Sequence, residues 1–390
     1  MSRRRIAVVT GGRPDYGLLR WLAHDLEQVE TCELQLVATG MHFAARFGRP
    51  IDEIRRDGLP IAAEVDMLED GDTRLSAARS AGRGVLGCAD AFDRLQPQIV
   101  VVLGDRFEIL AAAEAAMLLG IPVAHIHGGE VTEGSTDEFI RHAVTKMASL
   151  HFVSTDMFRS RLIRMGEQPG RVFNFGAIGL DQFVRLPLPE RGQLMTELGL
   201  APEEPFVLAT YHAATRSQSD PAVDARAMLD AIDRFPQFQV VLTQANADPG
   251  GQAINGVLST YVGGRGDGRA VLVPSLGSRL YLAAVTHAAA VLGNSSSGLI
   301  EAPAVGTPTV NIGPRQKGRP RAATVIDCGE SSADVAAAIA AAIAPAFRAR
   351  VSAAPPYGRP GNVSGRIMKV LLETDLGELF TKPFYDGVER

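Results

Sequence analysis

The sequence has few cysteines, few lysines and no long hydrophobic run. Its cysteines, Cys32, Cys88 and Cys328, are odd in number and far apart, so they fit neither a disulfide framework nor a metal-ligand spacing. Such usage is typical of a reducing compartment. No stretch approaches the ~20 apolar residues of a membrane span, and the apolar run Ile6–Val9 is too short for a signal peptide. We therefore expect a soluble, cytoplasmic protein with no membrane partner.

The sequence also lacks a large excess of positive or negative charge. The chain carries 39 Lys plus Arg against 44 Asp plus Glu, a net charge of −5, which gives no basic face and argues against a nucleic-acid partner. A hydrophobic content of 46% excludes wholesale disorder. The 390 residues exceed the ~250–300 at which one hydrophobic core stops growing, so we expect two domains.

Short β-branched runs alternate with longer Ala/Leu-rich segments along the whole chain. The runs are apolar on both faces, as strands of a helix-covered parallel sheet must be. The sequence therefore predicts an α/β fold of two Rossmann-like, doubly wound domains. The predicted strands are Ile6–Val9, Leu34–Ala38, Ile99–Leu103, Pro122–Ile126, Leu150–Val153, Val172–Phe175, Phe206–Ala209, Phe238–Leu242, Val271–Val273, Ala290–Leu292, Thr309–Ile312 and Thr324–Ile326.

Two breaks in the pattern predict the domain boundaries. Leu-Pro-Leu-Pro-Glu-Arg interrupts both periodicities after Arg185, and a Pro/Gly-rich stretch at 354–361 precedes a final segment. We expect a first domain at 1–185, a second at 186–362 and a C-terminal segment at 363–390. If the two domains face each other, the ligand lies in the cleft between their strand ends.

Chemically active side chains follow several strands of the first half. A glycine turn with Arg13 leads into a helix expected from Leu18, whose N-terminus favours an anion; an ordinary turn with a solvated Arg is the alternative. Asp105 follows Ile99–Leu103, at the edge where such sheets keep their sites, although a helix cap explains it too.

The densest chemical cluster is His-Ile-His-Gly-Gly-Glu at 125–130. Strand alternation places His125 and His127 on the same side. No metal-ligand spacing is present, so an acid/base group beside a glycine turn fits better, with one histidine left as a hydrogen-bonded core residue. Further on, Ser135 and Glu138 form a capping box, and Asp137 and Arg141 are spaced to pair on a helix. Capping alone explains these acids, but a catalytic role for Asp137 competes with it.

In the second half, the stretch 293–301 is the most informative. Its three adjacent serines and a glycine open a helix after a buried strand, and their amides and hydroxyls suit phosphate oxygens. Glu301, expected about one turn along that helix, suits the hydroxyls of a ribose. A serine cap with an acidic first turn is the alternative, but three serines exceed what capping needs. We therefore favour a nucleotide.

Together these motifs resemble the UDP-N-acetylglucosamine 2-epimerase family, in the hydrolysing branch that supplies sialic- and legionaminic-acid pathways. The resemblance runs in order from Val8 to Arg319 and is most specific in Gly104–Glu108, His125–Glu130, Asp137–Lys146, Gly293–Pro303 and Gly306–Arg319. It implies a glycosyltransferase-B-like fold with a C-terminal helix crossing back to the first domain. It also implies no metal, no NAD or other cofactor, and a homodimer or homotetramer.

The resemblance further implies a reaction and a set of residues. A base removes the C2 proton of the UDP-linked N-acetylated amino sugar while UDP leaves, giving a 2-acetamidoglycal, and water then adds to give the manno sugar. The implied catalytic residues are Asp105, His127, Glu130, Asp137, Arg141 and His212. The implied substrate-binding residues are Arg13, Arg106, Asn246, Asp248, Ser295, Ser296, Ser297, Glu301 and Arg315, of which Glu301 matches the ribose ligand and Arg13, Ser295 and Ser296, with His212, match diphosphate ligands.

One departure bears on the substrate. Some hydrolysing members carry a catalytic glutamate where this chain has His127, and the loop at 132–136 is one residue longer here. Either His127 or Glu130 takes the acid/base role, or the exchange marks another substrate, UDP-2,4-diacetamido-2,4,6-trideoxyglucose (UDP-diacetylbacillosamine). Two other classes stay open, a retaining glycosyltransferase of the same fold and a non-enzymatic nucleotide-sugar binder.

Overall fold

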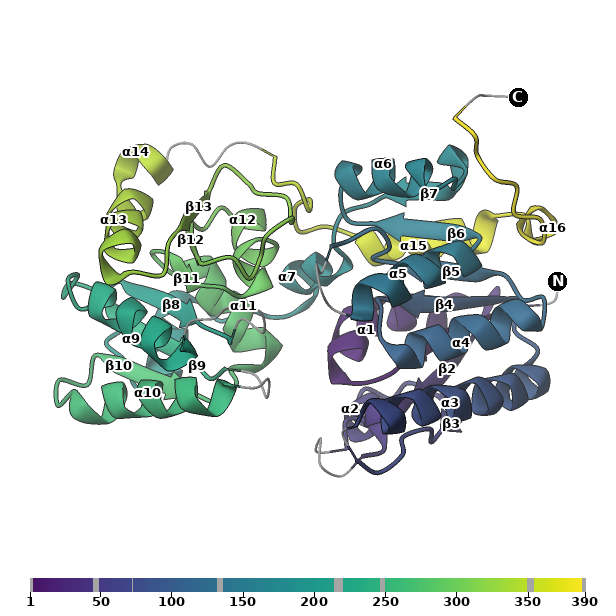
Figure 1. The fold of residues 1–390 in the computed structure, drawn as a ribbon, viewed down its shortest axis with the longest axis horizontal. Helices are drawn as coiled ribbons and strands as arrows, with labels where there is room; N and C mark the ends of the chain where they lie inside the picture. The colour runs from purple at the N-terminus through teal and green to yellow at the C-terminus, as the bar shows by residue number, and fades with distance from the viewer. Residues whose placement is uncertain are drawn as a thin grey trace. The chain divides into compact units, whose positions relative to one another are not determined.

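The computed structural model describes residues 3–44, 49–71, 73–131, 136–213, 220–245, 250–348 and 354–387. The chain divides into two compact units (Figure 1). Unit 1 comprises Met1–Asp181 and Asn362–Arg390, and unit 2 comprises Gln182–Gly361. Each unit is built around its own parallel sheet.

The sheet of unit 1 has seven strands in the order β3-β2-β1-β4-β5-β6-β7. The order reverses between β1 and β4, which makes the sheet doubly wound. The strands are β1 (Arg4–Thr10), β2 (Cys32–Thr39), β3 (Ile61–Val65), β4 (Ile99–Leu103), β5 (Val123–Ile126), β6 (Leu150–Val153) and β7 (Val172–Asn174). The helices are α1 (Arg13–Glu27), α2 (Ile51–Arg56), α3 (Arg74–Leu95), α4 (Phe107–Leu118), α5 (Thr136–Met147), α6 (Asp156–Arg164), α15 (Val363–Glu373) and α16 (Leu376–Leu379), with 3-10 turns η1 (Gly40–His42), η3 (Pro169–Arg171) and η4 (Ile178–Asp181).

Alternation along β1 divides the core of unit 1 into two layers. Ile6 and Val8 pack with apolar side chains of α1 and α15, whereas Ala7 and Val9 pack with those of α3, α4 and α5. Because both faces are covered, every position of the strand core is apolar, which is the pattern that the sequence shows.

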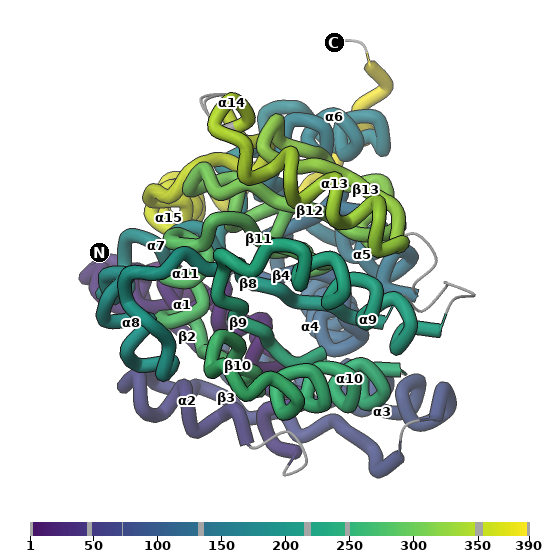
Figure 2. Tube along the Cα trace, turned by 90° about the vertical axis from the view of Figure 1, so that its left-hand side faces the viewer, coloured from purple at the N-terminus to yellow at the C-terminus, as the bar shows by residue number. Residues whose placement is uncertain are grey.

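Unit 2 repeats the architecture with six strands in the order β10-β9-β8-β11-β12-β13. The strands are β8 (Phe206–Thr210), β9 (Gln239–Thr243), β10 (Ala270–Val273), β11 (Val291–Gly293), β12 (Thr309–Ile312) and β13 (Val325–Cys328). The helices are α7 (Gln182–Arg185), α8 (Arg191–Glu197), α9 (Pro221–Ile232), α10 (Gly251–Gly264), α11 (Gly277–His287), α12 (Glu301–Ala304), α13 (Ser332–Ile343) and α14 (Pro345–Arg348), with a 3-10 turn η5 (Ser296–Gly298). Figure 2 shows α8 and α11 on one side of these strands and α9 and α10 on the other.

The C-terminal helix returns to unit 1, as the resemblance implied. The buried carboxylate of Asp181 accepts hydrogen bonds from the first amides of α15, Val363 N at 2.8 Å and Ser364 N at 2.7 Å. The guanidinium of Arg4 donates to the carbonyls of Leu371 and Thr374 near the other end of the helix. Both ends of α15 are therefore held by residues of the first part of the chain.

One strand was missed from the sequence, and one predicted helix start is wrong. The short edge strand β3 was not predicted, because Ile-Ala-Ala-Glu-Val has an exposed glutamate and lacks a β-branched run. Helix α1 begins at Arg13, not at Leu18. Pro14 stands in its first turn, where a fixed φ and the missing N–H cost nothing, so the turn residues belong to the helix.

Among the described residues, no helix is long and apolar enough to cross a membrane.

Candidate functional site

The carboxyl edge of the unit 1 sheet carries a buried ion-pair cluster around Arg141. This side chain projects from α5, is only 2% exposed, and pairs with Asp105, which directly follows the turn after β4. It also donates to Glu138 Oε2 at 2.7 Å and to the Glu130 carbonyl at 2.8 Å. A buried guanidinium is tolerated because acceptors surround it.

The environment of Asp105 shifts its proton affinity. Burial raises the pKa of this carboxyl, and the nearby charges of Asp137 and Glu130 add to that effect, although Arg141 opposes it. A buried carboxyl group with a perturbed pKa at a strand end is a candidate for proton transfer. The influence of Asp137 also places that residue, on the first turn of α5, beside the cluster.

His127 and Glu130 form a second acid/base pair beside the first. His127 Nδ1 lies 3.1 Å from Glu130 Oε1, and Glu130 Oε1 also accepts from Ser154 Oγ at 3.1 Å. His127 Nε2 has no hydrogen-bond partner among the residues that the structure describes. The carboxylate thus faces Nδ1 and leaves Nε2 as a buried ring nitrogen whose hydrogen bond is unfilled.

His125 has a different role from His127. It is fully buried in β5, where Nε2 contacts the Gly104 carbonyl at 2.8 Å and Nδ1 contacts Thr145 Oγ1 at 3.2 Å. Burial lowers its pKa to about 3, so it is neutral. The expected same-side placement of the two histidines is wrong, because β5 ends at Ile126 and His127 has a φ of 65°. The alternative of one core histidine is the correct one.

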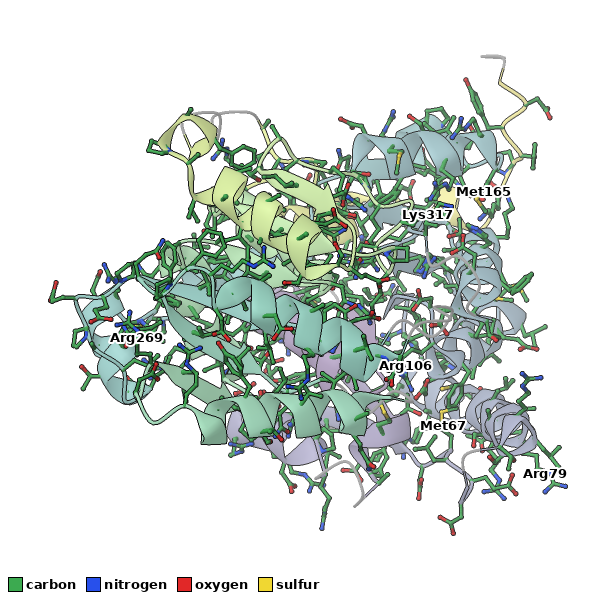
Figure 3. The ribbon with its side chains drawn as sticks, turned by 60° about the vertical axis from the view of Figure 1, so that its left-hand side comes forward. Met67, Arg79, Arg106, Met165, Arg269 and Lys317 are labelled. Atoms are coloured by element: carbon green, nitrogen blue, oxygen red, sulfur yellow. The ribbon has the colours of Figure 1, made fainter. Side chains whose placement is uncertain are left out.

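A third group of charges, Asp15, Arg106 and Glu108, lies at the ends of β1 and β4. Arg106, labelled in Figure 3, is 3.1 Å from Glu108 Oε1, and Glu108 is fully buried. Asp15 accepts from Gly11 N at 3.1 Å; burial raises its pKa to about 7, although Arg106 opposes the shift. Gly40 has a φ of 58°, and a Cβ there would come within 2.6 Å of Glu108, so this close approach requires glycine.

Sequence reasoning missed Asp15 and Glu108. Both stand inside motifs that it singled out, but only the fold shows that they are buried together. Arg13, in contrast, is largely exposed and pairs with Glu53 at 3.5 Å. A cavity of about 360 Å³ adjoins this charged group. Its lining comprises Gly71, the apolar Met41, Leu68, Ala77 and Phe107, the hydroxyl-bearing Thr73, Ser76 and Ser80, and the charged Glu69, Arg106 and Glu108.

In unit 2 the corresponding edge is built largely from neutral hydrogen-bonding groups, with Arg315 as a charged donor. The side chain of Asn294, after β11, accepts from His212 N and donates to the His212 carbonyl, both at 2.8 Å, which ties it to the end of β8. Gly293 has a φ of 118°, and a Cβ there would meet the Thr210 carbonyl oxygen at 1.9 Å. Arg315 donates to the Asn294 carbonyl at 3.1 Å, so its position is fixed to the same turn.

The serine stretch does not open one continuous helix. Ser295 caps the 3-10 turn η5, and Glu301 is the first residue of the separate, four-residue α12. The prediction that Glu301 lies one turn along a helix is therefore wrong. Pro303 explains the break, because it lacks the N–H that a continuous helix would direct back to residue 299. Tyr281 on α11 was also missed: its side chain contacts Ser297 and Ser295, and burial raises its pKa to about 12.

Some predicted residues lie outside the described part of the chain. These are Asn246, Asp248 and the loop 132–135, which includes the Ser135 half of the capping box. Within the described ranges, no group of three or more His, Cys, Asp or Glu residues is arranged to hold a metal ion.

The chain is similar in sequence to proteins of one known family. The sequence pattern of the UDP-N-acetylglucosamine 2-epimerase family matches residues 24–372. A Campylobacter jejuni protein named GDP/UDP-N,N'-diacetylbacillosamine 2-epimerase (hydrolyzing) is 36% identical over 84% of this chain and 85% of its own. Escherichia coli polysialic acid biosynthesis protein P7 is 36% identical over 83% of this chain and 82% of its own.

Solved structures share the fold. The UDP-GlcNAc 2-epimerase from Neisseria meningitidis, crystallised with UDP-GlcNAc, superposes with a TM-score of 0.80 at 18% identity and covers 95% of this chain and all of its own. The two doubly wound units are thus the glycosyltransferase-B-like fold that the resemblance implied. With the family pattern matching most of its length and relatives at 36% identity, the chain belongs to the UDP-N-acetylglucosamine 2-epimerase family.

Proposed function

We propose that this protein is a hydrolysing UDP-sugar 2-epimerase. The observation that carries the proposal is the pairing of two proton-transfer groups at one sheet edge, Asp105 held by the buried Arg141 and His127 held by Glu130. Loss of the C2 proton with departure of UDP, followed by hydration of the resulting glycal, requires two such groups.

In this proposal His127 exchanges protons and Glu130 orients it. A carboxylate accepting from Nδ1–H keeps the imidazole in the tautomer whose Nε2 is the basic nitrogen, and the 3.1 Å contact supports this arrangement. Asp105 is the second proton-transfer group, and Arg141 holds its carboxylate in place. Asp137, whose charge acts on Asp105, supports proton transfer from the first turn of α5.

Unit 2 holds the nucleotide in the same proposal. The amides and hydroxyls of Ser295, Ser296 and Ser297 bind the diphosphate, assisted by His212 and Arg315 on the adjoining turns. Glu301 accepts the ribose hydroxyls. In unit 1, Arg13 and Arg106 bind the substrate. In unit 2, Asn246 and Asp248 complete the sugar-side set by resemblance. No metal or organic cofactor takes part in the proposed reaction.

Two substrates fit the proposal, UDP-N-acetylglucosamine and UDP-diacetylbacillosamine. The second is favoured by the cavity beside Arg106, whose methionine, phenylalanine and alanine side chains suit methyl groups and whose serines suit an amide. The 36% identical Campylobacter jejuni protein is named for the diacetamido sugar. The product from UDP-diacetylbacillosamine would enter legionaminic-acid synthesis, and the product from UDP-N-acetylglucosamine would enter sialic-acid synthesis.

Incubation of the protein with each nucleotide sugar in D2O, followed by NMR, tests the proposal. We expect free UDP and a 2-inverted sugar that carries deuterium at C2. A retaining glycosyltransferase would leave the C2 proton in place, and a nucleotide-sugar sensor would release no UDP. Either result, with both substrates, refutes the epimerase.

We also propose a cytoplasmic homodimer or homotetramer. The described thiols are free, and Cys32 and Cys88 are buried, which suits a reducing compartment. Helices α3 and α4 pack side by side and carry exposed apolar residues, among them Leu86 at 71% and Leu118 at 69%, which a second copy would cover. Light scattering of the purified protein decides the oligomeric state, and a monomer at micromolar concentration would contradict it.

A further inference from the structure

Residues near the C-terminus of unit 1 form a strap across the segments that precede β6 and β7. We use "strap" for residues 376–385, which include α16. Arg171 donates to the carbonyls of Thr381 at 2.7 Å and Glu378 at 2.6 Å, and Ser149 Oγ donates to the Leu379 carbonyl at 3.0 Å. The amide of Tyr385 donates to the Gly166 carbonyl at 2.9 Å, next to Met165, which is labelled in Figure 3. The strap is therefore anchored along its length.

Lys382 of the strap binds the C-terminal end of α5. Its Nζ donates to the Thr145 carbonyl at 2.9 Å and also to the Ala148 carbonyl. The last carbonyls of a helix have no intrahelical partner and carry partial negative charge, so an ammonium group there both satisfies and stabilises them. Lys382 thus caps the helix that carries Asp137 and Arg141.

A buried carboxylate fixes Lys382 in that position. Glu167, 2% exposed, pairs with Lys382 at 2.8 Å, with Lys146 at 2.6 Å and with His151 at 2.9 Å. Burial opposes its ionisation, but the hydrogen bonds from these three groups outweigh burial and lower its pKa to about 2. Glu167 is therefore charged at neutral pH, and removing Lys382 would leave it short of a counter-charge.

A continuous set of contacts connects this end of α5 with Asp105. Thr145, whose carbonyl Lys382 binds, also contacts His125 Nδ1 through its hydroxyl at 3.2 Å. The other ring nitrogen of His125 contacts the carbonyl of Gly104, the residue before Asp105, at 2.8 Å. Arg141, the ion-pair partner of Asp105, stands one helical turn before Thr145 on the same helix.

We propose that Lys382 is a positioning residue that sets the register of α5 against the end of β4, and so the geometry of Asp105 and Arg141. The inference rests on the proposed function, because it assigns the strap to the proton-transfer step. Lys382 touches no substrate in this scheme. It acts through Thr145, His125 and the helix backbone.

The test compares Lys382→Met with the control Lys369→Met. Lys369 is 70% exposed, and its ammonium group lies 4.0 Å from Glu373, at the long end of the range for an ion pair. We expect kcat to fall on the order of 10–100-fold in Lys382→Met, with KM and UDP affinity unchanged, because a small misplacement of reacting groups costs this much. The control should retain the wild-type kcat. An unchanged kcat in Lys382→Met, or a loss confined to KM, would overturn the proposal.

Chemical rescue separates positioning from misfolding. The variant Lys382→Cys is made in a Cys328→Ser background, because Cys328 is the most exposed native thiol. Alkylation of the introduced thiol with bromoethylamine then rebuilds a lysine-like amine at this position. We expect the amine to restore kcat. If it restores only the melting temperature, Lys382 is a stability residue and the proposal fails.

Hydrogen–deuterium exchange keeps the inference independent of the proposed activity. Lys382→Met should speed exchange of the α5 amides after Arg141 while leaving those of α11 in unit 2 unchanged. If the wild-type protein epimerises neither sugar, the proposed function fails, whereas unchanged α5 exchange refutes the helix anchoring itself.

Discussion

The two units have the same doubly wound fold but carry opposite chemistry at their strand ends. In unit 1 the edge holds buried charges in pairs, Arg141 with Asp105 and Arg106 with Glu108. In unit 2 the edge is held largely by neutral groups, such as the Asn294 amide on the His212 backbone and the hydroxyls of Thr210 and Thr243, 2.6 Å apart. Buried charges are costly, so their presence on one edge indicates where proton affinities need tuning. Neutral donors suffice to hold an anion.

Removing a proton-transfer group of unit 1 should have the largest effect. For Asp105→Asn we expect kcat to fall by about 10²–10⁴-fold, because an amide cannot exchange the proton and Arg141 loses one of its two paired carboxylates. Steady-state UDP release measures it. Asp52→Asn, at an exposed position of α2, is the control and should leave kcat unchanged; an active Asp105→Asn removes this residue from the mechanism.

The Arg141 cluster should also dominate the stability of its edge. Arg141→Met leaves Asp105 and Glu138 without their buried partner, at a cost of about 3–5 kcal/mol in the free energy of unfolding. Urea unfolding measures the loss, and Arg279→Met, which breaks an exposed pair with Glu197 in unit 2, should cost under about 1 kcal/mol. Equal losses in the two variants would contradict the contrast between the edges.

Asp15 should make the stability of unit 1 depend on pH. Its pKa is raised to about 7 by burial, above the unfolded value near 3.9, so the folded state binds the extra proton. The stability that protonated Asp15 contributes is therefore fully present below about pH 4 and is lost as the pH rises to about 7. Asp15→Asn should be more stable than wild type at pH 8 by about 4 kcal/mol, because about three pKa units correspond to ~1.4 kcal/mol each. Thermal melts at pH 5 and pH 8 test this, and a difference that does not change with pH disproves the assignment.

The neutral edge of unit 2 should give the smallest effect, confined to binding. Ser295→Ala removes the cap of η5 and a hydroxyl proposed for the diphosphate. We expect about 1 kcal/mol weaker UDP binding, with kcat at saturating substrate unchanged. Calorimetry with UDP measures the first and initial rates the second. A fall in kcat with an unchanged UDP affinity would contradict the account, because it would assign proton transfer to unit 2.

Sequence reasoning predicted the framework better than the details of the site. Long apolar runs such as Ile99–Leu103 predict buried strands, since both faces are covered, and strand ends predict where Asp105 and His127 lie. The partners could not be predicted, because the burial of Asp15 with Glu108 and the choice of His125 as the core histidine depend on contacts between distant elements. β3 and the start of α1 were missed because local rules fail at an edge strand and at a proline in a first turn.

A UDP titration of the double variant Asp105→Asn/His127→Gln tests the division between the units most directly. Both changes lie on unit 1, and both remove proposed proton-transfer groups. The account predicts a UDP dissociation constant equal to that of the wild type in a protein that no longer turns over substrate. A UDP affinity that falls together with turnover would contradict it.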